Sequence, residues 1–127
     1  YMPLMHDADP RINAAVNYLK QQELEANVLI AHSLGSVMST HYLANNPDAF
    51  KRYVGIGMPD MTVQFLSKIS LPILDLYGNK DIPSVMSSAV DRANTGNKHY
   101  TQRKVSADHF FDGKDQLLID EVSAWLK

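Results

Sequence analysis

The apolar residues of this chain occur in two patterns, short continuous runs and longer stretches with helical spacing. Residues 27–31, 53–58 and 71–78 are nearly unbroken apolar runs, as expected for strands buried on both faces of a parallel sheet. Residues 98–105 alternate between apolar and polar types, which predicts a fourth strand near an edge. Helical segments separate the strands. We therefore expect an α/β fold with right-handed crossovers and a parallel sheet of about four strands flanked by helices.

Five segments have the apolar spacing of helices. The first is expected to begin with Asp9 as its N-cap and Pro10 in its first turn, and to end near Leu24. The last is strongly amphipathic, with its leucines and tryptophan on one face. The predicted helices cover residues 9–24, 34–45, 61–69, 84–94 and 115–126.

A serine lies at the junction between the first strand and the second helix, in the sequence Ala31-His32-Ser33-Leu34-Gly35. The small residues on either side leave room for a turn so tight that a larger Cβ would meet the neighbouring backbone. A serine on such a turn projects its hydroxyl from the end of the sheet, next to the amide of Leu34 and the helix N-terminus, which can stabilise an oxyanion. A short Ser/Gly pattern also occurs by chance in strand-to-helix loops, so the interpretation depends on partner residues.

A serine hydroxyl becomes a nucleophile when a base accepts its proton and a carboxylate orients that base. Asp81 follows the third predicted strand directly, and His109 lies in the loop between the fourth predicted strand and the last helix. Both are downstream of Ser33, and each comes after its own strand. The sequence therefore predicts a catalytic triad of Ser33, His109 and Asp81, with the Leu34 amide in the oxyanion hole.

Two other carboxylates are alternatives for the acid. Asp75 lies in the middle of the third strand, whereas catalytic groups cluster beyond the strand ends, so Asp81 is favoured over it. Asp108 is adjacent to His109, and neighbouring residues rarely point their side chains at one another. We expect Asp108 to form hydrogen bonds within the loop or to cap a helix.

The remaining histidines have weaker claims to a chemical role. His32 should point away from Ser33 by the alternation of the strand, in a packed or hydrogen-bonded role. His41 lies about two turns along the second helix, and His99 is in the predicted edge strand. His6, with Asp7 and Asp9, forms a small polar cluster that is interpreted as a solvated turn before a helix rather than as a metal site, because it specifies no coordination geometry.

The length and the composition exclude several classes of protein. At 127 residues the chain is expected to form a single domain, residues 1–127, with a moderate core. The net charge of −2 and the scattered charges argue against a nucleic-acid partner, and no apolar stretch is long enough for a membrane span. The chain has no cysteine, which excludes disulfides and thiolate chemistry but leaves the compartment, bacterial cytoplasm or periplasm, open.

Three segments resemble the α/β-hydrolase superfamily: A-H-S-L-G at residues 31–35, L-P-I-L-D-L-Y-G-N-K-D at 71–81 and A-D-H-F-F-D-G at 107–113. The first matches the nucleophile elbow, with Ala in place of the first Gly of G-x-S-x-G. Within the superfamily the chain is similar to a little-characterised bacterial family of unknown function that shares the L-D-L-Y-G strand. Further similarities to that family are Arg92, the Tyr-x-Gln stretch at 100–102 and the terminal Trp-Leu. Members of that family tend to carry export signals, which implies a periplasmic location if a region upstream of this chain carries one.

The resemblance covers only the second half of such a fold, because the elbow lies on the first strand here. The other half would supply a second oxyanion-hole amide and the strand that pairs beside residues 28–30. An apolar strand with an open edge invites pairing. The chain begins with Tyr1, without an initiator Met or a visible signal peptide. We therefore expect that the chain is the C-terminal half of a larger hydrolase, or that a second copy covers the edge.

The resemblance implies a serine hydrolase that cleaves an ester, a thioester or a related acyl bond of a small molecule and needs no cofactor. The alternative is a non-catalytic binding module on a hydrolase scaffold. A third option is a different use of the same triad, such as the hydrolysis of a peptide or a C–C bond.

An acyl pocket next to the serine would be lined by apolar side chains. Such side chains are also common in a hydrophobic core, so their type alone does not identify a pocket. The candidates are Met38, Ile82 and Phe110, with Val85, Met86 and Phe111 as further possibilities.

Overall fold

The computed structural model describes residues 2–127 and has four strands in one parallel sheet. The strands are β1 (Val28–His32), β2 (Arg52–Ile56), β3 (Ile73–Lys80) and β4 (Tyr100–Asp108), and they lie side by side in sequence order. The helices are α1 (Met2–Gln21), α2 (Leu34–Asn45), α3 (Val63–Leu66), α4 (Pro83–Ser87), α5 (Ala89–Ala93) and α6 (Asp115–Leu126), with a 3-10 turn, η1 (Asp60–Thr62), before α3. The predicted fold class, and β4 as an edge strand, are confirmed.

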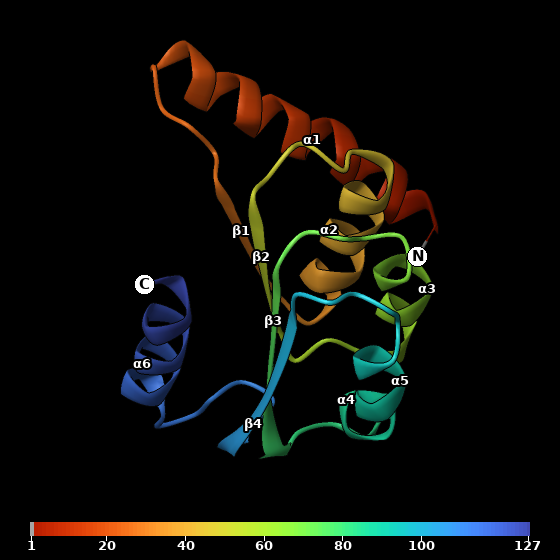
Figure 1. Ribbon diagram of the computed structural model, residues 1–127, viewed down its shortest axis with the longest axis vertical. Coiled ribbons are helices and arrows are strands. Elements are labelled where there is room, and N and C mark those ends of the chain that lie inside the picture. Colours follow the sequence, from red (N-terminus) through yellow and green to blue (C-terminus); the bar gives the residue numbers. More distant parts are fainter. Residues whose placement is uncertain (1) are drawn as a thin grey trace.

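The sheet is covered unequally on its two faces. Figure 1 shows α6 on one face and the other helices on the opposite face. On β3, Leu74 and Leu76 pack toward α6, whereas Ile73 joins the core under α1 to α3, as the two-residue period of a strand requires. The larger core on that side also contains the buried residues Val16, Tyr42, Leu43, Phe50, Tyr53, Met58, Leu66 and Ile69.

The first helix differs from its prediction. It begins at Met2 rather than at Asp9, and Pro10 lies inside it. An internal proline removes one helical hydrogen bond and costs roughly 3 kcal/mol in a helix interior. Tertiary contacts offset this cost, since the carboxylate of Asp9 pairs with His41 at 3.2 Å and the hydroxyl of Tyr42 donates to Asn13 at 2.6 Å. Asp9 therefore connects α1 to α2 through His41 and does not cap a helix.

The first strand is not buried on both faces, contrary to the prediction. β1 is the last strand on its side of the sheet, and the side chain of Ile30 is 50% exposed. Ile30 is in register with Val54 of β2 and so points to the α6 face. Since α6 packs on β2 to β4 through Leu118 and Val122, it leaves Ile30 open to solvent. The open apolar edge that the sequence predicts is therefore present in the structure.

Two other segments also depart from their predicted boundaries. The expected helix over 84–94 is split into α4 and α5 at Ser88. The guanidinium of Arg92 occupies the carbonyl of Val85, which would accept a backbone hydrogen bond in a continuous helix. It donates to the carbonyl of Val85 at 2.7 Å and to the hydroxyl of Ser88 at 2.6 Å. β4 extends to Asp108, three residues beyond the expected strand over 98–105, because it stays paired with β3 as far as Lys80.

In a parallel sheet the carboxyl ends of all strands lie at the same rim. The residues that directly follow the four strands are Ser33, Gly57, Asp81 and His109. The fold therefore places one residue from each of four loops at this rim.

Candidate active site

The turn that carries Ser33 is strained. Its backbone has φ 55° and ψ −123°, a left-handed conformation that is rare for any residue except glycine. The N–H of Ser33 donates to the carbonyl of Ile56 at 3.0 Å, and its own carbonyl accepts from the N–H of Ser36 at 2.9 Å. These bonds hold the turn against β2 and α2.

The small residues around the serine matter less than the sequence suggests. A Cβ added at Gly35 would lie 4.0 Å from the Cβ of Ala31, which is ordinary van der Waals contact. The expected collision at Gly35 is therefore wrong, and the strain of the elbow resides in the backbone of Ser33. Leu34 is the first residue of α2, so no intrahelical carbonyl accepts from its N–H.

The structure brings Ser33, His109 and Asp81 into one hydrogen-bonded chain. Nε2 of His109 lies 2.8 Å from Oγ of Ser33, and Nδ1 of His109 lies 2.6 Å from Oδ1 of Asp81. The side chain of His109 is 7% exposed and that of Asp81 is fully buried. Two ring nitrogens thus face two different partners, which is the arrangement that orients an imidazole between a hydroxyl and a carboxylate.

Backbone groups hold the carboxylate of Asp81 in place. Its Oδ1 accepts from the N–H of Ile82 at 2.8 Å and its Oδ2 from the N–H of Gly78 at 3.2 Å. A Cβ at Gly78 would lie 2.0 Å from the carbonyl oxygen of Ala107, so only glycine fits between β3 and β4 at this level. The distance to the N–H of Ile82 lies in the range of charge-assisted bonds to a carboxylate.

Gly57 forms the wall behind the imidazole. It has φ +60°, and a Cβ there would lie 2.9 Å from Cε1 and Nδ1 of His109 and 3.7 Å from Oδ2 of Asp81. The absence of a side chain lets the ring approach the backbone at the end of β2. The role of Gly57 was not predicted, because Gly57 lies inside the strand expected over residues 53–58. A glycine within that run was the available signal of a close backbone approach.

The three residues expected to line an acyl pocket lie in different places. Phe110 is 71% exposed, and its ring meets that of His109 edge-on with centroids 5.0 Å apart. Ile82 is 39% exposed and follows Asp81 directly. Met38 lines a cavity of about 330 Å³ between α1 and the elbow, together with Ile12, Leu29, Ala31 and Gly35. The structure thus puts Phe110 beside the imidazole, while Met38 lines a separate groove.

Other histidines and acids have local partners. Asp108 accepts from the backbone N–H groups of Asp112 and Phe110, and these bonds hold its pKa below the usual value. The role expected for it in the loop is confirmed. His41 pairs with Asp9, His99 lies just before β4 and is exposed, and His6 and Asp7 lie within α1 rather than in a turn before a helix.

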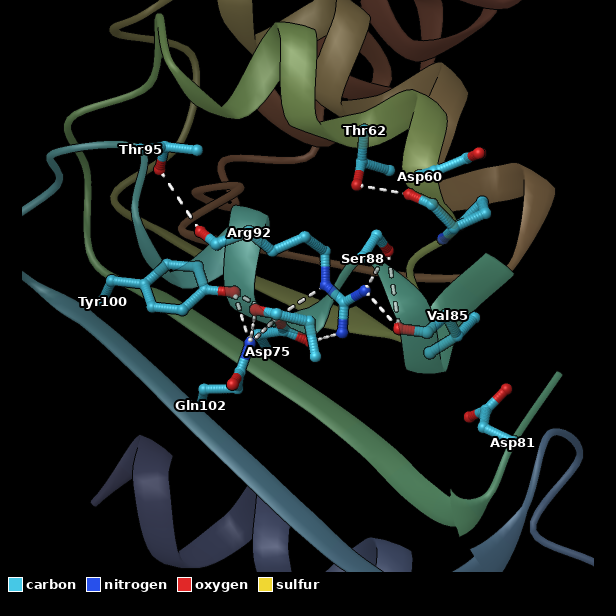
Figure 2. Close-up of polar contacts among 12 residues, drawn as sticks. Asp60, Thr62, Asp75, Asp81, Val85, Ser88, Arg92, Thr95, Tyr100 and Gln102 are labelled. Carbon is cyan, nitrogen blue, oxygen red and sulfur yellow. Dashed lines mark hydrogen bonds and ion pairs between the residues drawn. The ribbon is translucent and has the colours of Figure 1, made fainter. Parts of the chain in front are cut away.

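Asp75 belongs to a different cluster. Its buried carboxylate accepts from Nε of Arg92 at 2.7 Å, from the amide of Gln102 at 3.0 Å and from the hydroxyl of Tyr100. Figure 2 shows these side chains converging on Asp75, with Asp81 apart from them beyond the end of β3. Burial and the neighbouring carboxylate raise the pKa of Tyr100, so its hydroxyl stays protonated and donates. Residues 92, 100 and 102 were visible in the sequence only as parts of a family resemblance, whereas Asp75 was considered as an alternative acid.

The chain is similar to solved structures, although its sequence matches no known family. Models of known protein families and curated proteins gave no match to the sequence. Among solved structures, the esterase domain of a Rhodothermus marinus protein is similar with a TM-score of 0.77 and 16% identity, over 91% of this chain and 66% of that one. Est1E from Butyrivibrio proteoclasticus is similar with a TM-score of 0.76 and 16% identity, over 91% of this chain and 66% of Est1E. A monoacylglycerol lipase of Paleococcus ferrophilus is similar with a TM-score of 0.73 and 13% identity, over 94% of this chain and 75% of the lipase.

The chain has an α/β-hydrolase fold. It spans between 59% and 66% of the length of the first three similar structures, which include a predicted hydrolase from Thermoplasma acidophilum. Within residues 2–127, no helix is both long and apolar enough to cross a bilayer.

Proposed function

We propose that the protein is a serine hydrolase that cleaves an ester, a thioester or a related acyl bond of a small molecule. The observation that carries the proposal is the continuous hydrogen-bonded chain from Ser33 Oγ through His109 to Asp81. The likeness to solved esterases and lipases supports the same class.

The proposed reaction has two stages. Oγ of Ser33 forms a bond to the acyl carbon while Nε2 of His109 accepts the hydroxyl proton. His109 then gives this proton to the leaving group as the bond to that group breaks, which leaves an acyl-enzyme. In the second stage His109 removes a proton from water as the water oxygen bonds to the acyl carbon. The bond between that carbon and Oγ of Ser33 then breaks, His109 gives the proton back to Oγ, and the carboxylic acid is released. Asp81 keeps the hydrogen of the imidazole on Nδ1 throughout.

The developing oxyanion is expected to lie against the N-terminus of α2. The N–H of Leu34 is the donor that this chain offers there, and the dipole of the 12-residue helix adds to it. The loss of one donor from a two-donor oxyanion hole costs on the order of 10²–10³ in rate. Turnover by this chain is therefore expected to be slower than by a complete hydrolase, whereas covalent labelling of Ser33 remains measurable.

Labelling with a fluorophosphonate probe tests the proposal without knowledge of the substrate. The 127-residue chain should be labelled at Ser33, as mapped by peptide mass spectrometry, and Ser33→Ala should not be labelled. Ser67→Ala is the matched control, since Ser67 is exposed on the surface and its hydroxyl donates to the carbonyl of Gln64, away from Ser33. A correctly folded chain with an unlabelled Ser33 would favour a non-catalytic binding module instead.

We further propose that the open edge of β1 is covered in the working protein, by preceding polypeptide or by a second copy of this chain. The support is the exposed Ile30 on an edge strand, and the larger size of the similar structures. Measuring the mass of the natural protein and the oligomeric state of the 127-residue chain distinguishes the two. If the chain is a monomer in the cell with nothing else attached, the proposal fails; if it is a dimer, Ile30→Lys should dissociate it.

A further inference from the structure

His32 links the strand of the proposed nucleophile to the loop of the proposed base. Its Nε2 lies 2.8 Å from the backbone carbonyl oxygen of His109. Its ring lies 4.8 Å from the ring of His109 and 5.7 Å from that of Phe110, measured between centroids. A carbonyl oxygen only accepts hydrogen bonds, so Nε2 of His32 carries the hydrogen and donates it. This contact agrees with the hydrogen-bonded role expected for His32 and adds its partner.

The bond joins two parts of the fold that are distant in the sheet, and it adds a backbone contact to the side-chain contact between His109 and Ser33. His32 ends β1 and His109 follows β4, and these strands are at opposite edges of the sheet with β2 and β3 between them. The two residues are 77 positions apart in the sequence. The hydrogen bond therefore sets the position of the His109 backbone directly against the strand that leads into Ser33.

The loop after β4 needs such an anchor. Phe111 adopts φ 54°, a strained conformation for an aromatic residue, and is buried, whereas Phe110 is mostly exposed. Asp108 fixes the N–H groups of Phe110 and Asp112 within the loop. These bonds shape the loop but do not place it relative to β1. The donor of His32 places the backbone of His109 there, next to the side-chain contact that His109 makes with Ser33.

We propose that His32 is a positioning residue for the reaction proposed above. By donating to the carbonyl of His109 it holds the imidazole within hydrogen-bond distance of Ser33 Oγ. His32 bonds to neither the hydroxyl nor the carboxylate of the triad, so it acts only through His109. A displacement of about 1 Å at a reacting group can cost on the order of 10²-fold in rate. This inference rests on the proposed function, because it assigns the rate to the geometry of Ser33 and His109.

The test separates the donor of His32 from its ring. His32→Phe keeps a ring without a donor, and His32→Gln keeps an amide donor without the ring. We expect His32→Phe to lower the rate of fluorophosphonate labelling and kcat for p-nitrophenyl acetate by roughly 10–100-fold with little change in KM. His32→Gln should recover most of that loss. His41→Phe is the matched control, since His41 contacts Asp9 and Phe65 instead, and it should be labelled at the wild-type rate.

The outcomes distinguish failure of this inference from failure of the proposed function. If wild-type protein is not labelled at Ser33, the proposed function fails and this inference falls with it. If wild-type protein is labelled and His32→Phe is labelled equally fast, or the Phe and Gln variants are equally slow, only the positioning role is rejected. Nitrogen-detected NMR of the wild-type protein gives a check that needs no active variant. A hydrogen on Nε2 of His32 is expected, and a ring whose only hydrogen is on Nδ1 overturns the proposal.

Discussion

Two carboxylates with buried side chains, one within strand β3 and one directly after it, have different partners. Asp75 lies in the middle of the strand and is paired with Arg92, both side chains being fully buried. Asp81 lies just beyond its end, is also fully buried and is paired with His109. Arg92 carries a permanent charge, whereas an imidazole can gain and lose a proton at neutral pH. A carboxylate held by a permanent cation inside the sheet serves the fold, and one held against an imidazole at the rim can serve chemistry.

Burial alone does not identify a catalytic acid here. Both carboxylates accept several hydrogen bonds, Asp75 from three side chains and Asp81 from two backbone N–H groups and His109. The informative differences are the kind of partner and the position relative to the strand end. The same substitution at the two positions therefore tests the distinction.

The largest expected effect follows from Asp81→Asn. An amide in place of the carboxylate favours the wrong tautomer of His109 and fails to stabilise its charged form. Loss of the triad carboxylate costs about 10⁴-fold in kcat in a well-studied protease. We expect a similar loss in the rate of p-nitrophenyl acetate hydrolysis, with a melting temperature within a few degrees of the wild-type value. An Asp81→Asn variant of wild-type activity would exclude Asp81 as the acid.

The matching change, Asp75→Asn, is expected to act on stability. It leaves the guanidinium of Arg92 buried without its counter-charge, and removal of one partner of a buried ion pair costs about 3–5 kcal/mol. Urea unfolding followed by circular dichroism should show this loss, while the labelling rate per folded molecule stays near that of the wild type. The double variant Asp75→Leu/Arg92→Met should recover much of the stability, since apolar replacement of both partners is often tolerated. A stable but unlabelled Asp75→Asn variant would reverse the assignment of the two carboxylates.

Gly57→Ala should have an intermediate effect. The new Cβ would lie 2.9 Å from the ring of His109, and the backbone has φ +60°, which disfavours alanine. We expect the ring to shift and the labelling rate to fall by roughly 10–100-fold. Gly96→Ala is the matched control, because Gly96 also has positive φ but its Cβ would meet nothing within 4 Å. Equal labelling of the two variants would show that Gly57 does not set the position of His109.

The smallest expected effect is a change in the pH dependence of stability. Burial, together with the charge of Asp75, raises the pKa of Tyr100 above its ordinary value of 10.0. In the unfolded chain the phenol loses its proton above about pH 10, and in the folded chain it does not, so the unfolding free energy falls as the pH rises through this range. One such group contributes a slope of at most about 1.4 kcal/mol per pH unit. Tyr100→Phe should reduce the slope between pH 10 and 11, and an unchanged slope would show that Tyr100 ionises normally.

The general architecture could be predicted from the sequence because it follows from simple periodicities. Apolar runs between helical segments specify a parallel sheet, and α6 has the boundaries expected for it. A parallel sheet in turn places residues that follow strands, such as Ser33, Asp81 and His109, at one rim. That reasoning needs only the positions of strand ends, and it tolerates boundary errors of two or three residues.

Features that depend on individual side-chain contacts could not be predicted in this way. The helix α1 continues through Pro10 because of its contacts with α2, and α4 ends at Ser87 because Arg92 competes for the carbonyl of Val85. Each is a case in which tertiary contacts override local propensity. The closeness of Gly57 to His109 likewise depends on loops that are distant in the sequence.

The most direct test of the central claim is to trap the acyl-enzyme. The protein would be mixed with excess p-nitrophenyl acetate, quenched in acid after a few seconds and digested for mass spectrometry. The account predicts one acetyl group on the peptide that contains Ser33, present in wild type and in Asp75→Asn and strongly reduced in Asp81→Asn. Acetylation of other residues alone, or equal acetylation of Ser33 in the Asp81→Asn variant, would contradict it.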